Sequence, residues 1–225
     1  MQNSLPRLTH EQFLEQFQHK WRQGQHVLLI GPTGSGKTIV AQDVEELRQH
    51  VVVIATKAKD ESLERYKRFS KMDHWPPQWY EKLILYWKRP RNLGDFKEQR
   101  AGIYQVMSDL YEIGGWTVYF DDLYYVSNTL GLKGAIQMFY TQVRSNNVSI
   151  MASIQRPAWV PLEAVSQSTY ALVFSIRDER DIVRVAEGLS LAPKELKSAI
   201  GNLKQYEFLF LETGQPLQLV EKRKL

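Results

Sequence analysis

The chain has 225 residues, of which 43% are apolar, so it can form one domain with a complete hydrophobic core. It contains no cysteine, which excludes disulfide frameworks and thiolate zinc sites. Its apolar runs are shorter than the ~18 residues of a membrane span, and its start lacks the apolar stretch of a signal peptide, so we expect no membrane span. The net charge of +4 permits a nucleic-acid partner without requiring one.

Short apolar runs alternate with longer amphipathic stretches, which predicts an α/β fold with a mainly parallel central sheet flanked by helices. Thr9 and Gln12 match a capping box that opens a first helix, and Gly24 ends it. We therefore expect residues 1–24 to be an N-terminal helical extension and residues 25–225 to be the main domain. Strands are expected at 26–30, 51–55, 83–87, 116–120, 148–154, 170–176 and 206–211, and further helices at about 37–49, 96–113, 132–144 and 178–188.

A glycine-rich loop follows the first buried strand and opens a helix. Its glycines let the backbone approach phosphate oxygens, and its N–H groups form an anion nest at the helix N-terminus. Lys37 is expected to reach the β- and γ-phosphates of ATP, and the Thr38 hydroxyl to ligate Mg²⁺. The sequence therefore predicts a P-loop NTPase that binds and hydrolyses ATP with magnesium. The loop consists of Gly31, Pro32, Thr33, Gly34, Ser35, Gly36, Lys37 and Thr38.

Two aspartates end the buried strand at 116–120. P-loop enzymes place the carboxylate that holds the metal at the end of such a strand. We assign Asp121 to the magnesium shell, directly or through its water ligands, and Asp122 to orienting or deprotonating the attacking water. The alternative is that the pair only starts a turn before Leu123.

A single amide side chain, Gln155, ends the next buried strand at 148–154. An amide beside the γ-phosphate can bond both phosphate and water, so Gln155 could sense whether that phosphate is present. The alternative is that Gln155 ends a loop before the turn at Pro157.

Together these features resemble the FtsK–HerA group of P-loop DNA-pumping ATPases, which have a RecA/ASCE-like fold. The resemblance lies in the phosphate loop, the strand that ends in Asp121 and Asp122, the segment 150–157, and Arg144 upstream of it. The group includes chromosome and conjugation translocases and viral genome-packaging ATPases. It differs from this chain in usually carrying Glu where Asp122 stands.

The resemblance implies that Arg144 is an arginine finger that reaches the ATP of a neighbouring subunit, and that Gln155 is the sensor. A guanidinium on the γ-phosphate stabilises the charge that develops during transfer, worth ~10³–10⁵ in rate. Arg156 is the alternative finger, and a solvated arginine at a helix C-terminus is the alternative role for Arg144.

The resemblance further implies an ATP-driven motor that moves double-stranded DNA. The short length of this chain favours the viral members of the group, which package a genome into a capsid. The expected partners are double-stranded DNA, further copies in a ring-shaped homo-oligomer (pentamer or hexamer), and capsid portal or vertex proteins. The expected location is the cytoplasm, which would be the host cytoplasm for a viral protein. The virion is the other expected location. The alternatives are a small-molecule or nucleoside kinase, and a non-motor ATP-dependent switch or assembly protein.

A basic cluster follows the strand at 83–87. Lys88, Arg89 and Arg91 lie beside several aromatic residues, a combination that suits a surface gripping DNA phosphates. We interpret these three residues as candidate nucleic-acid contacts.

Overall fold

The computed structural model describes residues 5–56, 63, 66–69, 82–87 and 95–224. Its strands are β1 (Arg7–Leu8), β2 (His26–Ile30), β3 (His50–Ile54), β4 (Lys67–Phe69), β5 (Leu83–Trp87), β6 (Thr117–Phe120), β7 (Ser149–Ile154), β8 (Ser168–Val173), β9 (Phe208–Glu212) and β10 (Gln218–Val220). Its α-helices are α1 (His10–Lys20), α2 (Lys37–Glu45), α3 (Phe96–Ile113), α4 (Lys133–Gln142), α5 (Leu162–Ser166), α6 (Glu179–Gly188) and α7 (Pro193–Gly201). A π-helix η2 (Tyr125–Thr129) and short 3₁₀ turns η3 (Val143–Asn146) and η4 (Pro157–Trp159) complete the described elements.

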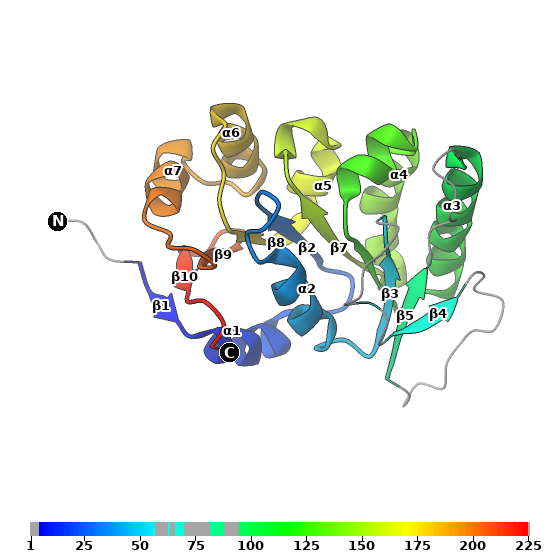
Figure 1. Cartoon of the computed structure of the whole chain (residues 1–225), viewed down its shortest axis with the longest axis horizontal. Coiled ribbons are helices and arrows are strands. Elements are labelled where there is room, and N and C mark those ends of the chain that lie inside the picture. Colours follow the sequence, from blue (N-terminus) through cyan, green and yellow to red (C-terminus); the bar gives the residue numbers. More distant parts are fainter. Residues whose placement is uncertain (1–4, 57–62, 64–65, 70–81, 88–94, 225) are drawn as a thin grey trace.

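All of these strands join one ten-stranded sheet, in the order β1-β10-β9-β8-β2-β7-β6-β3-β5-β4 (Figure 1). From β8 to β4 each neighbouring pair is parallel, whereas β9 pairs antiparallel with both β8 and β10. The expected α/β fold with a mainly parallel sheet is therefore confirmed. Parallel pairing has a direct consequence for function, because it brings the carboxyl ends of β2, β7 and β6 to the same edge.

Helices cover both faces of the sheet, so its central strands are apolar on both sides. In β2, Leu28 and Ile30 join the core under α3 to α7, while Val27 and Leu29 join the core under α1 and α2. Figure 1 shows α3 to α7 along one side of the sheet, with α1 and α2 on the other. This arrangement explains why β2 appears in the sequence as an uninterrupted apolar run rather than an alternating one.

The first helix begins as its sequence predicts. Thr9 accepts a hydrogen bond from the Gln12 backbone N–H, and the Gln12 side chain accepts one from the Thr9 N–H, which completes the capping box. Phe13 and Phe17 are fully buried in the core that α1 shares with α2. The division of the chain at residue 24 stays a prediction.

Several element boundaries differ from those expected. The strand prediction at 206–211 is wrong at its start, because β9 begins at Phe208 and Tyr206 lies in the preceding turn with a φ of 67°. The helix expected at 37–49 ends at Glu45, where the chain turns toward β3. The short strands β1 and β10, which lie next to each other at one end of the sheet, escaped prediction because strands of two or three residues carry no usable periodicity. Within the described ranges, we find no helix with the length and apolarity needed to span a membrane.

Candidate nucleotide site

The phosphate loop joins the end of β2 to the start of α2. Gly34 and Gly36 have φ values of 79° and 99°, a region that L-residues rarely adopt, so the loop needs glycine at both positions. The Lys37 Nζ donates hydrogen bonds to the carbonyl oxygens of Gly31 (2.6 Å) and Pro32 (2.8 Å). The ammonium therefore lies across the mouth of its own loop, where a phosphate chain would meet it.

The surroundings of the loop fit an anion. A Cβ at Gly31 would lie 3.0 Å from both the Phe174 Cβ and the Ser35 Oγ, so a side chain there would fill the space inside the loop. The Ser35 Oγ is buried, and no hydrogen-bond partner for it lies among the described residues. A buried hydroxyl of this kind is costly unless a ligand atom satisfies it. The cradle is thus small, glycine-walled and lined by donors.

Asp121 follows β6, which lies one strand away from β2 across β7. Its Oδ1 accepts hydrogen bonds from the Thr56 backbone N–H (3.0 Å) and from the Thr56 Oγ1 (2.6 Å). Thr56 follows β3, and the sequence analysis missed it, although its place after a buried strand is the signal that could have found it. These two bonds fix the orientation of the Asp121 carboxylate at the carboxyl edge of the sheet.

Asp122 has a structural contact in the chain itself. Its Oδ1 accepts a hydrogen bond from the Tyr125 N–H at 3.0 Å, at the start of the π-helix η2. The turn role considered as an alternative is therefore present for this carboxylate. Such π-helical segments are rare and are often found at functional sites.

Gln155 follows β7 and is exposed at the same edge. The Thr33 Oγ1 lies 3.4 Å from the Gln155 Oε1 and donates to it, which joins the phosphate loop to the end of β7. The Gly31 N–H also donates to the Ile154 carbonyl at 3.1 Å. The structure thus brings Lys37, Asp121 and Gln155 to the ends of three neighbouring parallel strands.

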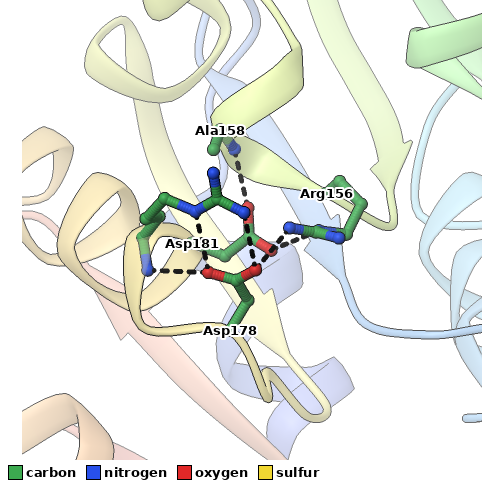
Figure 2. Close-up of polar contacts among 5 residues, drawn as sticks. Arg156, Ala158, Asp178 and Asp181 are labelled. Carbon is green, nitrogen blue, oxygen red and sulfur yellow. Dashed lines mark hydrogen bonds and ion pairs between the residues drawn. The ribbon is translucent and has the colours of Figure 1, made fainter.

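Arg156, the next residue, is held within its own chain (Figure 2). Its Nε donates to the Asp181 Oδ2 and its Nη2 to the Asp178 Oδ2, each at 2.6 Å. The Asp181 side chain is only 2% exposed, and its Oδ1 also accepts from the Ala158 N–H at 2.8 Å. We call Arg156, Asp178 and Asp181 the arginine clamp, because they join the loop after β7 to the start of α6.

Two more contacts complete the clamp. The Arg156 guanidinium lies 4.3 Å above the Trp159 ring. Asp178 caps α6 by accepting from the Arg180 backbone N–H at 3.0 Å. Hydrogen bonds from Arg180, followed by the charges of Arg180 and Arg156, lower the pKa of the Asp178 carboxyl. Arg156 is thus committed to carboxylates of its own chain, which disfavours it as a finger for a neighbour.

Arg144 lies at the other end of β7. It belongs to η3, and its carbonyl oxygen and Cγ lie 3.2 and 3.6 Å from the position a Cβ would take on Gly24, just before β2 begins. The six residues of β7 span about 20 Å at ~3.3 Å per residue. The exposed Arg144 side chain is therefore too far away to reach the phosphate loop of its own chain.

His26, a buried residue at the start of β2, lies near Arg144. Burial lowers the pKa of His26 to about 4, with a smaller lowering from the Arg144 charge. His26 is 1% exposed, and its Nδ1 accepts from the Ile150 N–H at 3.0 Å. A neutral imidazole therefore ties β2 to β7 beside Arg144. The candidate nucleic-acid contacts Lys88, Arg89 and Arg91 lie outside the described residues.

The clamp gives a stability prediction. Arg156→Ala should lower the free energy of unfolding by about 2 kcal/mol, because the buried Asp181 carboxylate would lose its charged partner. Arg180→Ala is the matched control, since that side chain is 75% exposed, and it should change stability little. Urea unfolding of both variants at neutral pH measures the difference. Equal stabilities of the two variants would contradict the clamp.

The chain is similar to known proteins in sequence and in fold. No protein-family model matches the chain. The chain is 25% identical over 198 residues to the DNA packaging ATPase P9 of Enterobacteria phage PRD1, covering 84% of this chain and 83% of P9.

Two solved structures show the same fold. The genome packaging NTPase B204 of Sulfolobus turreted icosahedral virus 2, in complex with AMPPCP, matches 89% of this chain and 98% of its own, with a TM-score of 0.66 and 14% identity. VirB4 of Thermoanaerobacter pseudethanolicus matches 89% of each chain, with a TM-score of 0.66 and 10% identity. The resemblance to the FtsK–HerA group is thereby confirmed: this chain is similar in sequence to a viral DNA-packaging ATPase and shares its fold with B204 and VirB4.

Proposed function

We propose that this chain is an ATP-driven motor that moves double-stranded DNA, as a viral genome-packaging ATPase. The observation that carries the proposal is the meeting of the phosphate loop, Asp121 and Gln155 at one edge of a parallel sheet. Similarity to P9 along most of the chain supports the proposal that ATP hydrolysis drives genome packaging.

Two residues of the phosphate loop and Asp121 have defined roles in this proposal. Lys37 places a positive charge on the β- and γ-phosphates, and Thr38 and Asp121 hold Mg²⁺. Among the described residues no group of three or more His, Cys, Asp or Glu side chains could hold a metal by itself. That finding suits Mg²⁺, which proteins bind with one or two carboxylates together with phosphate oxygens. The bound ion would supply charge neutralisation at the phosphates.

Asp122 and Gln155 act on the attacking water in this scheme. One Asp122 oxygen is committed to the Tyr125 N–H, so its carboxylate has a fixed orientation beside Asp121. The Gln155 amide contacts the loop at Thr33, close to where the γ-phosphate would lie. Gln155 can therefore bond the phosphate and the water together, and it loses one of these partners after hydrolysis.

Arg144 completes the site of a neighbouring subunit. Its place at the far end of β7 supports action in trans, and the commitment of Arg156 to Asp178 and Asp181 supports Arg144 as the finger. A ring of five or six copies would repeat this contact at every interface. Hydrolysis in one subunit would then depend on the position of the next.

The remaining partners follow from the motor function. Lys88, Arg89 and Arg91 are the candidate contacts to DNA phosphates. Capsid portal or vertex proteins are the proposed docking partners, and the host cytoplasm or the virion is the proposed location. A nucleoside kinase and an ATP-dependent switch remain the rival functions, and they differ from a motor in what stimulates turnover.

Stimulation of ATP turnover separates these three functions. Long duplex DNA should raise the ATPase rate of the wild-type chain, and Lys37→Ala should lower it by roughly 100-fold or more, because the charge on the phosphates is lost. Steady-state ATPase assays with duplex DNA, with a nucleoside, and with neither make the comparison, and circular dichroism checks the fold of the variant. Stimulation by a nucleoside would indicate a kinase, and no stimulation would indicate a switch.

Mixing experiments test Arg144 in trans. Arg144→Ala should bind ATP normally but lose turnover by ~10³-fold, and Asp122→Asn should also be inactive. Mixed rings of the two variants should regain part of the activity, because some interfaces then contain both an intact Asp122 and an intact Arg144. Lys133→Ala, an exposed change at the opposite end of α4, is the control and should stay active. Co-assembled but inactive mixtures at every ratio would exclude a finger in trans.

A further inference from the structure

A tyrosine lies in a turn that favours glycine. The Glu207 N–H donates to the Lys204 carbonyl at 3.1 Å, which closes a four-residue turn between α7 and β9. Tyr206, the third residue of this turn, has a φ of 67°. Turns with positive φ at this position prefer Gly or Asn, and a bulky residue there is strained. Strain of this kind is often found where a side chain serves a ligand.

The turn is firmly braced. Glu207 is 6% exposed, and its Oε2 accepts from the Lys204 N–H at 2.8 Å. The Arg7 Nη1 lies 3.8 Å from the other Glu207 oxygen, which ties the turn to β1. Phe208, the next residue, is fully buried in β9. The backbone on both sides of Tyr206 is therefore fixed, and the strained conformation is held by the fold.

The Tyr206 ring is directed at the phosphate loop instead of the core. Its Cδ1 lies 3.3 Å from the position that a Cβ would take on Gly36, the last glycine before Lys37. Tyr206 is nevertheless 48% exposed. The Phe174 Cε1 lies 3.8 Å from the same Gly36 position, and Phe174 is buried together with Phe208, their ring centroids 5.0 Å apart. A half-exposed aromatic ring thus borders the loop, near a pair of buried phenylalanines.

The order of the strands indicates which end of a bound nucleotide lies near Tyr206. Gln155 and Asp121 follow β7 and β6, on one side of β2, and they mark the side of the γ-phosphate. Tyr206 precedes β9, which lies beyond β8 on the opposite side of β2. A triphosphate that wraps the loop with its γ-phosphate at Gln155 directs its nucleoside toward β8 and β9.

We propose that the Tyr206 ring stacks on the base of the bound purine nucleoside triphosphate and fixes the position of the nucleoside. This inference rests on the proposed ATP binding at the phosphate loop. Stacking of a base on an aromatic ring is worth ~1–3 kcal/mol by truncation, which is roughly a 5- to 150-fold change in Kd. A base-stacking role explains why a strained tyrosine occupies a turn position suited to glycine.

Tyr206→Gly separates stacking from structure, because glycine removes the ring and also relieves the strained φ. Isothermal titration with Mg·ATP and with magnesium tripolyphosphate, which has no base, gives the two affinities. The Kd for ATP should rise about ten-fold, the Kd for tripolyphosphate should stay within two-fold, and the Tm should be unchanged or higher. Tyr206→Phe keeps the ring and should bind ATP within two-fold of wild type.

Tyr104→Ala, at a 52% exposed tyrosine on α3, is the control and should leave both affinities unchanged. Equal weakening of ATP and tripolyphosphate in Tyr206→Gly would mean that the turn shapes the loop, and would overturn the stacking role. Unchanged ATP affinity would place the base elsewhere and overturn it as well. A wild-type chain that binds neither ligand would refute the proposed ATP binding itself, which is a distinguishable failure.

Discussion

Parallel pairing of β7 with β2 on one side and β6 on the other is the constraint on which the site depends. It places the ends of three strands at one edge, so the phosphate loop, Asp121 and Gln155 meet without any long connecting loop. Arg144 lies in η3, just before the opposite end of β7, about 20 Å away. One end of β7 thus leads to Gln155, which faces the nucleotide of its own subunit. The other end lies next to Arg144, which in our proposal faces the nucleotide of a neighbour. Because β7 is paired on both sides, a displacement of Gln155 would be transmitted along the whole strand.

The arginine clamp extends this strand into the helical layer. Arg156 ties the loop after β7 to Asp178 and Asp181 at the start of α6, and α6 leads on to α7 and the turn that holds Tyr206. The residues proposed to meet the two ends of a nucleotide, Gln155 and Tyr206, are therefore connected through one continuous piece of packed structure. Because the buried Asp181 needs its partner, the connection is rigid, and it leaves Arg156 committed to its own chain.

The sequence predicted those parts of the site that depend on local chemistry. The phosphate loop follows from its glycine spacing, and Asp121 and Gln155 were found because each polar residue directly follows a buried apolar run. Contacts between distant segments were not predictable in this way. Thr56 bonds Asp121 only because β3 and β6 pair, and the clamp needs residues more than twenty positions apart. The run from Tyr206 to Leu211 is aromatic and apolar apart from Glu207 and therefore favours a strand, but the braced turn overrides this preference at Tyr206.

Directional movement along double-stranded DNA is the central claim, and displacement of a third strand measures it most directly. A labelled oligonucleotide is bound as a triplex at one end of a long duplex, and its release is followed after ATP is added. We predict that the wild-type chain releases the third strand in an ATP-dependent manner, more slowly on longer duplex tracks, and that Lys37→Ala does not. ATP hydrolysis by the assembled wild-type protein on duplex DNA without release of the third strand would contradict the motor.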